Sequence, residues 1–152
     1  MSADGQDGSI VLLVWIYSRL TACMASLLTI FIQVEDNEIN MKLLVALMKK
    51  LKLHYDCAGN GQQALDMYTN NPSKYFLIMM DLSMPVMDGF DSTAQIREVE
   101  KKRKLQRCTV VALTGVTSGE ERDGAIRSGV DRVITKPVRM TDLSTIVNEA
   151  HK

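Results

Sequence analysis

The chain has 152 residues, enough for one domain with a buried core, and 46% hydrophobic and 24% charged residues are ordinary for a globular protein. Its 18 basic and 18 acidic residues balance, so the overall charge does not favour nucleic-acid binding. The cysteines (Cys23, Cys57 and Cys108) lack the spacing of a zinc site or a disulfide framework, which favours reduced thiols and a cytoplasmic location.

The N-terminal part differs from the rest of the chain. Residues 10–32, IVLLVWIYSRLTACMASLLTIFI, form a long apolar stretch whose length suits a membrane span of ~20 residues. Arg19 near its middle would cost roughly 2.5 kcal/mol or more in a bilayer, and the preceding segment is acidic where a signal peptide is basic. We therefore expect residues 1–27 to be an atypical apolar leader, either an extra helix or disordered, and residues 28–152 to form the domain. A membrane anchor and a translated non-coding segment are the less favoured alternatives.

From residue 28 onward, strand-like and helix-like segments alternate. Strands are predicted at 28–34, 53–58, 75–80, 109–114 and 131–135. Helices are predicted at 37–53, 59–71, 91–105, 118–129 and 140–152, with Ser118 and Thr141 as N-caps and Gly129 as the end of the fourth. Five alternations with short connections predict an α/β domain with a parallel sheet, and continuous apolar strands such as YFLIMM indicate helices on both faces.

The first of these helices has an apolar pattern that predicts a buried face. Six apolar residues recur in it at helical spacing: Ile39, Leu43, Leu44, Leu47, Met48 and Leu51. A basic run, KKRK at residues 101–104, lies late on a later helix just after two glutamates. We interpret this run as a solvated helix end and expect no contact with nucleic acid.

Polar side chains stand where several predicted strands end. Glu35 and Asp36 follow the first strand, Asp81 the third, Thr114 ends the fourth, and Lys136 follows the fifth. In open α/β sheets ligands bind at the carboxyl ends of the strands, near the point where strand order reverses. With the order 2-1-3-4-5, Asp36 and Asp81 lie on neighbouring strands ~4.8 Å apart, and a lysine side chain spans most of the ~10 Å from the fifth strand.

These side chains suit phosphoryl chemistry. Carboxylates gathered in one crevice repel each other, and a hard divalent cation such as Mg²⁺, which prefers oxygen ligands, relieves that repulsion. Mg²⁺ and Lys136 would neutralise phosphoryl oxygens while a positioned carboxylate attacks phosphorus in line. The sequence therefore predicts that Asp81 is a nucleophile and that Thr114 donates its hydroxyl to the resulting phosphate.

Four motifs in this order, VEDNEIN, MMDLSMPVMDG, ALTG and ITKPV, resemble those of the receiver domain of two-component response regulators, in the style of eukaryotic hybrid histidine kinases. The resemblance covers roughly residues 28–148. It implies a doubly wound, five-stranded parallel sheet of order 2-1-3-4-5 between two layers of helices, the flavodoxin-like arrangement of CheY. It also implies a signalling module of a phosphorelay rather than an enzyme.

The resemblance further implies a role for each acidic residue. Asp81 would be the phosphoacceptor, taking its phosphoryl group from a phosphohistidine on a histidine kinase or a histidine phosphotransfer protein. Glu35 and Asp36 would hold Mg²⁺ together with Asp81 and the backbone carbonyl of Ser83.

The remaining motif residues are also assigned by the resemblance. Thr114 would be the switch hydroxyl and Lys136 the phosphate-binding amine, and the Lys136–Pro137 peptide bond is often cis in the family. Output to a downstream protein is expected through the face made by the helix at 118–129, the strand at 131–135 and the last helix.

Two positions depart from the family pattern. Val133 stands where an aromatic residue is usual, which puts signalling through the fifth strand in question, and Gln33 stands where the first strand usually has an aliphatic residue. An imperfect first strand would misplace Asp36 and weaken binding of Mg²⁺. A pseudo-receiver that acts only as a protein-interaction module is therefore the alternative function.

Two further functions fit the sequence less well. An aspartyl-phosphate phosphatase of the haloacid dehalogenase type needs a second acid two residues after its nucleophile, where this chain has Ser83. A flavodoxin would need a loop rich in Ser, Thr and Gly after its first strand, whereas VEDNEIN is acidic and would repel a phosphate in the absence of a metal.

Overall fold

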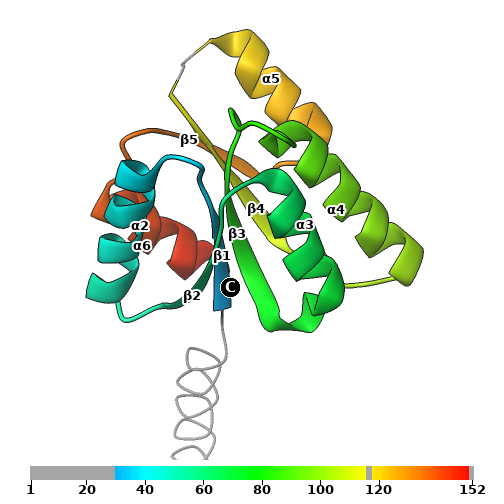
Figure 1. The fold of residues 1–152 in the computed structure, drawn as a ribbon, viewed down its shortest axis with the longest axis horizontal. Helices are drawn as coiled ribbons and strands as arrows, with labels where there is room; N and C mark the ends of the chain where they lie inside the picture. The colour runs from blue at the N-terminus through cyan, green and yellow to red at the C-terminus, as the bar shows by residue number, and fades with distance from the viewer. Residues whose placement is uncertain (1–29, 116–117, 151–152) are drawn as a thin grey trace, which may run out of the picture.

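The computed structural model describes residues 30–115 and 118–150, so the predictions made for residues 1–29 lie outside the described residues. Strands and helices alternate along the chain (Figure 1): β1 Ile30–Val34, α2 Glu38–Lys50, β2 His54–Ala58, α3 Gly61–Asn70, a short 3₁₀ turn at Pro72–Lys74, β3 Tyr75–Asp81, α4 Gly89–Arg103, β4 Thr109–Thr114, α5 Gly119–Ser128, β5 Arg132–Thr135 and α6 Met140–Ala150. The five strands are parallel and stand in the order β2-β1-β3-β4-β5, which confirms the predicted topology.

The sheet lies between two helical layers (Figure 1), each with its own core. Helices α2 and α6 cover one face, and their Met48 and Leu143 pack with Phe31 and Leu77 of the sheet. Helices α3, α4 and α5 cover the other face. Successive strand residues point to opposite faces, so a sheet covered on both sides needs continuous apolar strands. The run YFLIMM was recognised for this reason, and its last four residues are completely buried.

Side chains at the helix ends explain most of the boundaries. Asn37, Asn60 and Asp88 accept backbone N–H groups at the starts of α2, α3 and α4. Ser118 does the same for α5, which ends at Gly129 with a φ of 100°, as predicted.

The predicted cap of the last helix is wrong. Helix α6 begins at Met140, so Thr141 lies inside its first turn rather than before it. The carboxylate of Asp142 instead accepts the backbone N–H of Arg139 at 3.0 Å. An acid at the third helical position reaches back to the residue before the helix in this way, and that interaction sets the start of α6.

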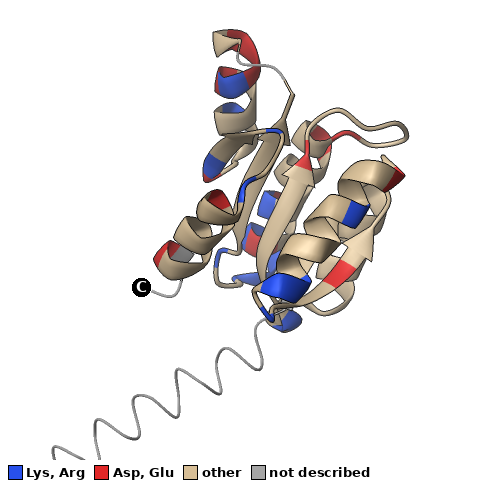
Figure 2. Ribbon diagram, turned by 90° about the vertical axis from the view of Figure 1, so that its left-hand side faces the viewer, with Lys and Arg blue, Asp and Glu red and all other residues tan. Residues whose placement is uncertain are grey.

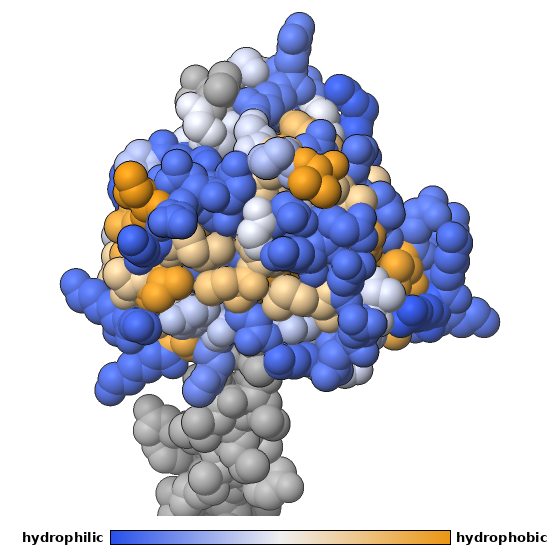
Figure 3. Space-filling view, viewed as in Figure 1, coloured by the Kyte–Doolittle hydropathy of each residue, from blue (hydrophilic) through white to orange (hydrophobic). Residues whose placement is uncertain are grey.

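The apolar face of α2 is narrower than predicted. Leu44 and Met48 are buried, but Ile39 is 77% exposed and Leu43 is 44% exposed. Ile39 and Leu43 are four residues apart and form a row of their own, about 100° around the helix from the row of Leu44 and Met48. Leu47 and Leu51, further along the row of Ile39 and Leu43, are partly buried against the same core as Met48, so only the N-terminal part of that row is left at the surface. Figure 3 shows hydrophobic residues at the surface on the side of α2.

Strand β1 is fully formed despite Gln33. All five of its residues pair with β2 and with β3, although the register shifts between Ile30 and Phe31. The Gln33 side chain is completely buried, and neither its amide nitrogen nor its amide oxygen has a hydrogen-bond partner. The predicted imperfection is therefore a buried amide without a partner and a register shift at the start of the strand, and the strand still pairs along its whole length.

Two sequence interpretations concern partners. The basic run at residues 101–104 is exposed and ends α4, as predicted, with Lys104 in the left-handed conformation. Within residues 30–115 and 118–150, none of the helices combines the length and the apolar character needed to cross a bilayer. The cytoplasmic location stays a prediction.

Candidate functional site

The predicted site residues lie at the carboxyl ends of four strands. In the register of the central pair, Val34 of β1 lies beside Met80 of β3, so Glu35 and Asp81 follow at the same level. Figure 2 marks acidic positions at this end of the central strands. Thr114 is the last residue of β4, and Lys136 comes directly after β5. The sheet order therefore brings together residues that are up to 101 positions apart in the chain.

A buried ion-pair triad forms the centre of the site. The Lys136 amine lies 3.2 Å from an oxygen of Glu35 and 3.2 Å from an oxygen of Asp81. Both acids are almost completely buried, with 3% and 2% exposure. Their other oxygens are also bonded: Glu35 accepts the N–H of Asn37 at 3.1 Å and Asp81 accepts the N–H of Ser83 at 3.2 Å. These contacts fix the orientation of both carboxylates.

The charge of Lys136 is set by this environment. Burial alone would lower the pKa of the Lys136 amine, because it disfavours the charged form. The carboxylates of Asp81 and Glu35 act in the opposite direction and outweigh burial, so the pKa of Lys136 lies above its ordinary value. The amine is therefore a fixed positive charge at neutral pH.

A third carboxylate completes the site. Glu35, Asp36 and Asp81 each offer an oxygen, and these oxygens lie within 4.8 Å of one another. Asp36 is exposed, whereas the other two acids are buried. With all three ionised, one lysine leaves two negative charges uncompensated. Carboxylate oxygens in this number and spacing fit a hard divalent cation such as Mg²⁺, which takes one or two carboxylates and keeps several waters.

Two predicted residues stand at the edge of this cluster. Thr114 is 3% exposed, and its carbonyl accepts the backbone N–H of Lys136 at 2.7 Å, which ties the end of β4 to the start of the β5–α6 loop. Ser83 lies exposed in the loop after β3 and donates its N–H to Asp81. The Lys136–Pro137 peptide bond is cis.

The loop after β3 depends on two glycines that the sequence analysis did not assign to the site. A Cβ on Gly89 would lie 2.2 Å from the carbonyl oxygen of Asp81, and one on Gly61 would lie 2.6 Å from the carbonyl of Met87. The N–H of Gly61 also donates to Met87. These close approaches hold the loop against the nucleophile candidate. The Asp88-Gly89 pair is the sequence signal for this loop, since Asp88 also caps α4.

Val133 takes the place of the expected aromatic residue on β5. Its side chain is partly buried and packs against the core on the α3–α5 face of the sheet. It also lines a surface pocket together with residues of α5 and α6. The substitution thus leaves the acidic site complete and changes the side chain that β5 presents next to α5.

Comparison with known proteins identifies the class. Residues 30–148 match the response regulator receiver domain family, and the chain belongs to that family. The fold is the CheY-like one, with five parallel strands in the order 2-1-3-4-5. Receiver domains are signalling modules of two-component systems. The match begins at residue 30, so the domain boundary placed at residue 28 stays a prediction.

Particular relatives place the chain within this family. It is 36% identical over 110 residues to hybrid signal transduction histidine kinase A of Dictyostelium discoideum, covering 72% of this chain but only 5% of that kinase. Among solved structures it is similar to the receiver domain of the response regulator Ssk1 of Saccharomyces cerevisiae, crystallised with the histidine phosphotransfer signalling protein Ypd1. That match has a TM-score of 0.75 and 34% identity and covers 81% of this chain and 88% of the other.

A second solved structure bears on the metal. The receiver domain of the sensor histidine kinase PA1611 of Pseudomonas aeruginosa has a magnesium ion coordinated in its active-site cleft. It matches with a TM-score of 0.71 and 27% identity, covering 80% of this chain and 96% of that one.

Proposed function

We propose that this chain is a phosphoacceptor: it accepts a phosphoryl group from a phosphohistidine onto Asp81, with Mg²⁺ bound beside it. The observation that carries the proposal is the Lys136 amine 3.2 Å from Asp81, next to carboxylate oxygens within 4.8 Å of one another. A buried carboxylate that is oriented by a backbone N–H and flanked by a fixed cation is suited to attack at phosphorus.

The transfer step follows from this geometry. An oxygen of Asp81 forms the new bond to phosphorus, and the bond from phosphorus to the donor's imidazole nitrogen breaks. The imidazole keeps that electron pair and takes up a proton from solvent. Lys136 then has a phosphoryl oxygen as its partner in addition to Glu35, and this positive charge stabilises the negative charge of the phosphoryl group. The Thr114 hydroxyl is assigned to a phosphoryl oxygen other than the one that contacts Lys136.

The metal ligands proposed are Glu35, Asp36, Asp81 and the carbonyl of Ser83. Bound Mg²⁺ would neutralise the carboxylates and the phosphoryl oxygens. The residues themselves support this assignment, because two acids are held in place by backbone N–H groups while Asp36 stays exposed at the entrance.

The proposed phosphodonor is a histidine kinase or a histidine phosphotransfer protein. The receiver domain of Ssk1, a relative, was crystallised with such a phosphotransfer protein. In this chain Ile39 and Leu43 are exposed on α2 beyond Asp36, and Val86 is 87% exposed in the loop after β3. Apolar side chains of this kind around a polar site suit a protein partner. The downstream partner is assigned to a different surface, made by α5, β5 and α6.

Intact-protein mass spectrometry with Mg²⁺ and a small phosphodonor tests the proposal. The wild-type chain is expected to gain one phosphoryl group, and this gain should disappear when Mg²⁺ is chelated. Asp81→Asn should gain none, whereas the matched variant Asp123→Asn, at an exposed position on α5, should react like wild type. Lys136→Ala should react roughly 100-fold more slowly but still bind Mg²⁺. An unmodified wild-type mass would favour the pseudo-receiver function instead.

A further inference from the structure

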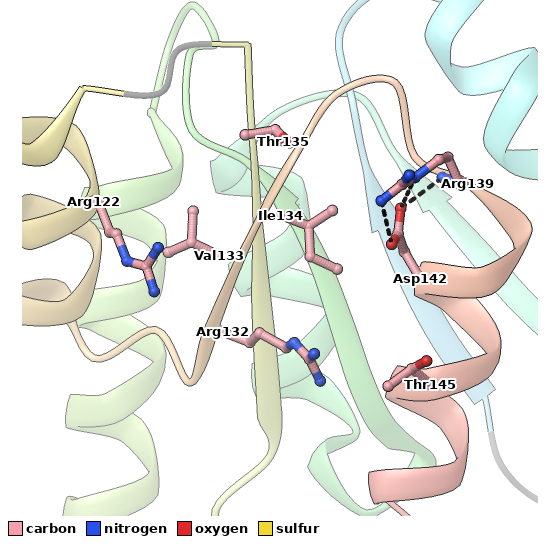
Figure 4. Close-up of a pocket in the computed structure, with 8 residues that line it drawn as sticks. All are labelled: Arg122, Arg132, Val133, Ile134, Thr135, Arg139, Asp142 and Thr145. Atoms are coloured by element: carbon pink, nitrogen blue, oxygen red, sulfur yellow. Dashed lines mark hydrogen bonds and ion pairs between the residues drawn. The ribbon is translucent and has the colours of Figure 1, made fainter.

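A pocket of about 310 Å³ lies on the proposed output surface, where β5 forms the edge of the sheet between α5 and α6. All four residues of β5 line it, with Val133 and Ile134 as apolar contacts. Figure 4 shows Arg122 reaching toward it from α5 on one side and Arg139, just before the start of α6, on the other. The pocket is therefore a groove along an open strand edge with charged walls.

The strand edge offers unused backbone groups. In the described sheet β5 pairs only with β4. Alternate residues of an edge strand direct their N–H and C=O groups away from the neighbouring strand, where a further extended segment can pair with them. A segment that adds a strand in this way gains affinity from the main chain and specificity from its side chains.

The charges around the groove favour an acidic segment. Three arginines and one aspartate line it. Arg139 is bonded to Asp142, and Arg132 to Glu149 on α6. Arg122 forms no ion pair with any residue that the structure describes. The groove therefore has one guanidinium without a carboxylate partner, next to the half-buried side chain of Val133.

We propose that this groove binds an extended acidic segment of the downstream protein, which pairs with the open edge of β5 and places a carboxylate against Arg122. The proposal rests on the proposed function, because it names the chemistry of the partner on the output surface. Val133 contributes to it directly: a small side chain at this position leaves room between α5 and β5 for a side chain of the incoming segment.

The test uses the full chain labelled with ¹⁵N and a synthetic peptide in which Glu and Val alternate. Titration should give saturable changes in the amide signals of β5. A peptide in which Lys replaces every Glu should give none, and neither should a Glu peptide in which every backbone nitrogen is methylated, because neither of its edges can then donate a hydrogen bond. Raised salt should weaken binding of the Glu peptide.

Variants locate the charge contact. Arg122→Gln should weaken binding about fivefold, the size expected for a partly exposed ion pair. Arg127→Gln is the matched control, because Arg127 is exposed on the same helix and does not line the groove. Equal binding of the Glu and Lys peptides, equal binding of the N-methylated peptide, or no binding of any peptide would overturn the proposal.

A second copy of this chain is the remaining possible occupant of the groove, and self-association is measured separately. Concentration-dependent changes of the β5 signals without peptide, together with a dimer in sedimentation equilibrium, would assign the groove to a second copy and overturn the proposal. The peptide titration needs no phosphoryl group. A failure at this groove is thus distinguishable from a failure of phosphorylation at Asp81.

Discussion

The completely buried amide of Gln33 should make the domain less stable than it would be with an apolar side chain at that position. Gln33 lies in the middle of the sheet between Cys57 of β2 and Met79 of β3, and neither of its amide atoms has a partner. A buried polar group without a hydrogen bond costs roughly 1–3 kcal/mol. Methionine has nearly the same length and volume, so Gln33→Met removes the polar group without leaving a cavity.

We expect Gln33→Met to raise the free energy of unfolding by about 1–3 kcal/mol, which corresponds to a rise in Tm of roughly 2–12 °C for a chain of this size. Urea unfolding followed by circular dichroism measures this as a higher midpoint with an unchanged slope. Gln106→Met, at an exposed loop position, should change stability by less than about 0.5 kcal/mol. An unchanged or lower midpoint for Gln33→Met would refute the reasoning and indicate that the amide has a partner in solution.

Three further predictions concern groups away from the phosphoacceptor site. Arg97→Met should destabilise the domain by roughly 3–5 kcal/mol in urea unfolding, because it leaves the buried carboxylate of Glu100 without its ion-pair partner at 2.9 Å; a loss below about 1 kcal/mol would contradict this. The hydrogen bond from Lys74 is the largest cause that lowers the pKa of Asp56 below its ordinary value of 3.8. The pair therefore stabilises the fold above pH 3.8, and this contribution disappears as the pH falls through the lower pKa of the folded state. Lys74→Met should remove this part of the dependence of stability on acid pH, and the same acid profile for variant and wild type would contradict the contribution of the pair. Burial raises the pKa of Cys108 to about 12, so this thiol should resist alkylation at pH 8 until urea unfolds the chain, whereas the exposed Cys57 should react in the native protein. Peptide mapping distinguishes the two cysteines, and rapid labelling of Cys108 in the native protein would contradict its burial.

The parallel sheet was predictable because the signals were local, whereas its strand order was implied by the resemblance to receiver domains. Each buried strand is a short apolar run, each connection is short, and the acids follow the strands directly in sequence. Once the order is known, the meeting of Glu35, Asp81 and Lys136 follows from the topology alone. The caps at Ser118 and Gly129 were predictable for the same reason.

The features that were missed depend on packing between distant segments. Nothing near Gly61 in sequence indicates that its missing side chain makes room for the loop after β3. The exposure of Ile39 depends on how far along α2 its row of apolar residues stays in contact with the core, and the apolar pattern does not decide that. Thr141 was a reasonable cap by residue type, but the carboxylate of Asp142 competes for the same turn and prevails.

The phosphoacceptor assignment is tested most directly by locating the phosphoryl group. Borohydride reduces an aspartyl phosphate to homoserine, which peptide mass mapping identifies after the chain has reacted with a phosphodonor and Mg²⁺. The account predicts conversion at Asp81 alone, at the end of β3. Conversion at another acid, or none under conditions that phosphorylate a known receiver, would contradict it.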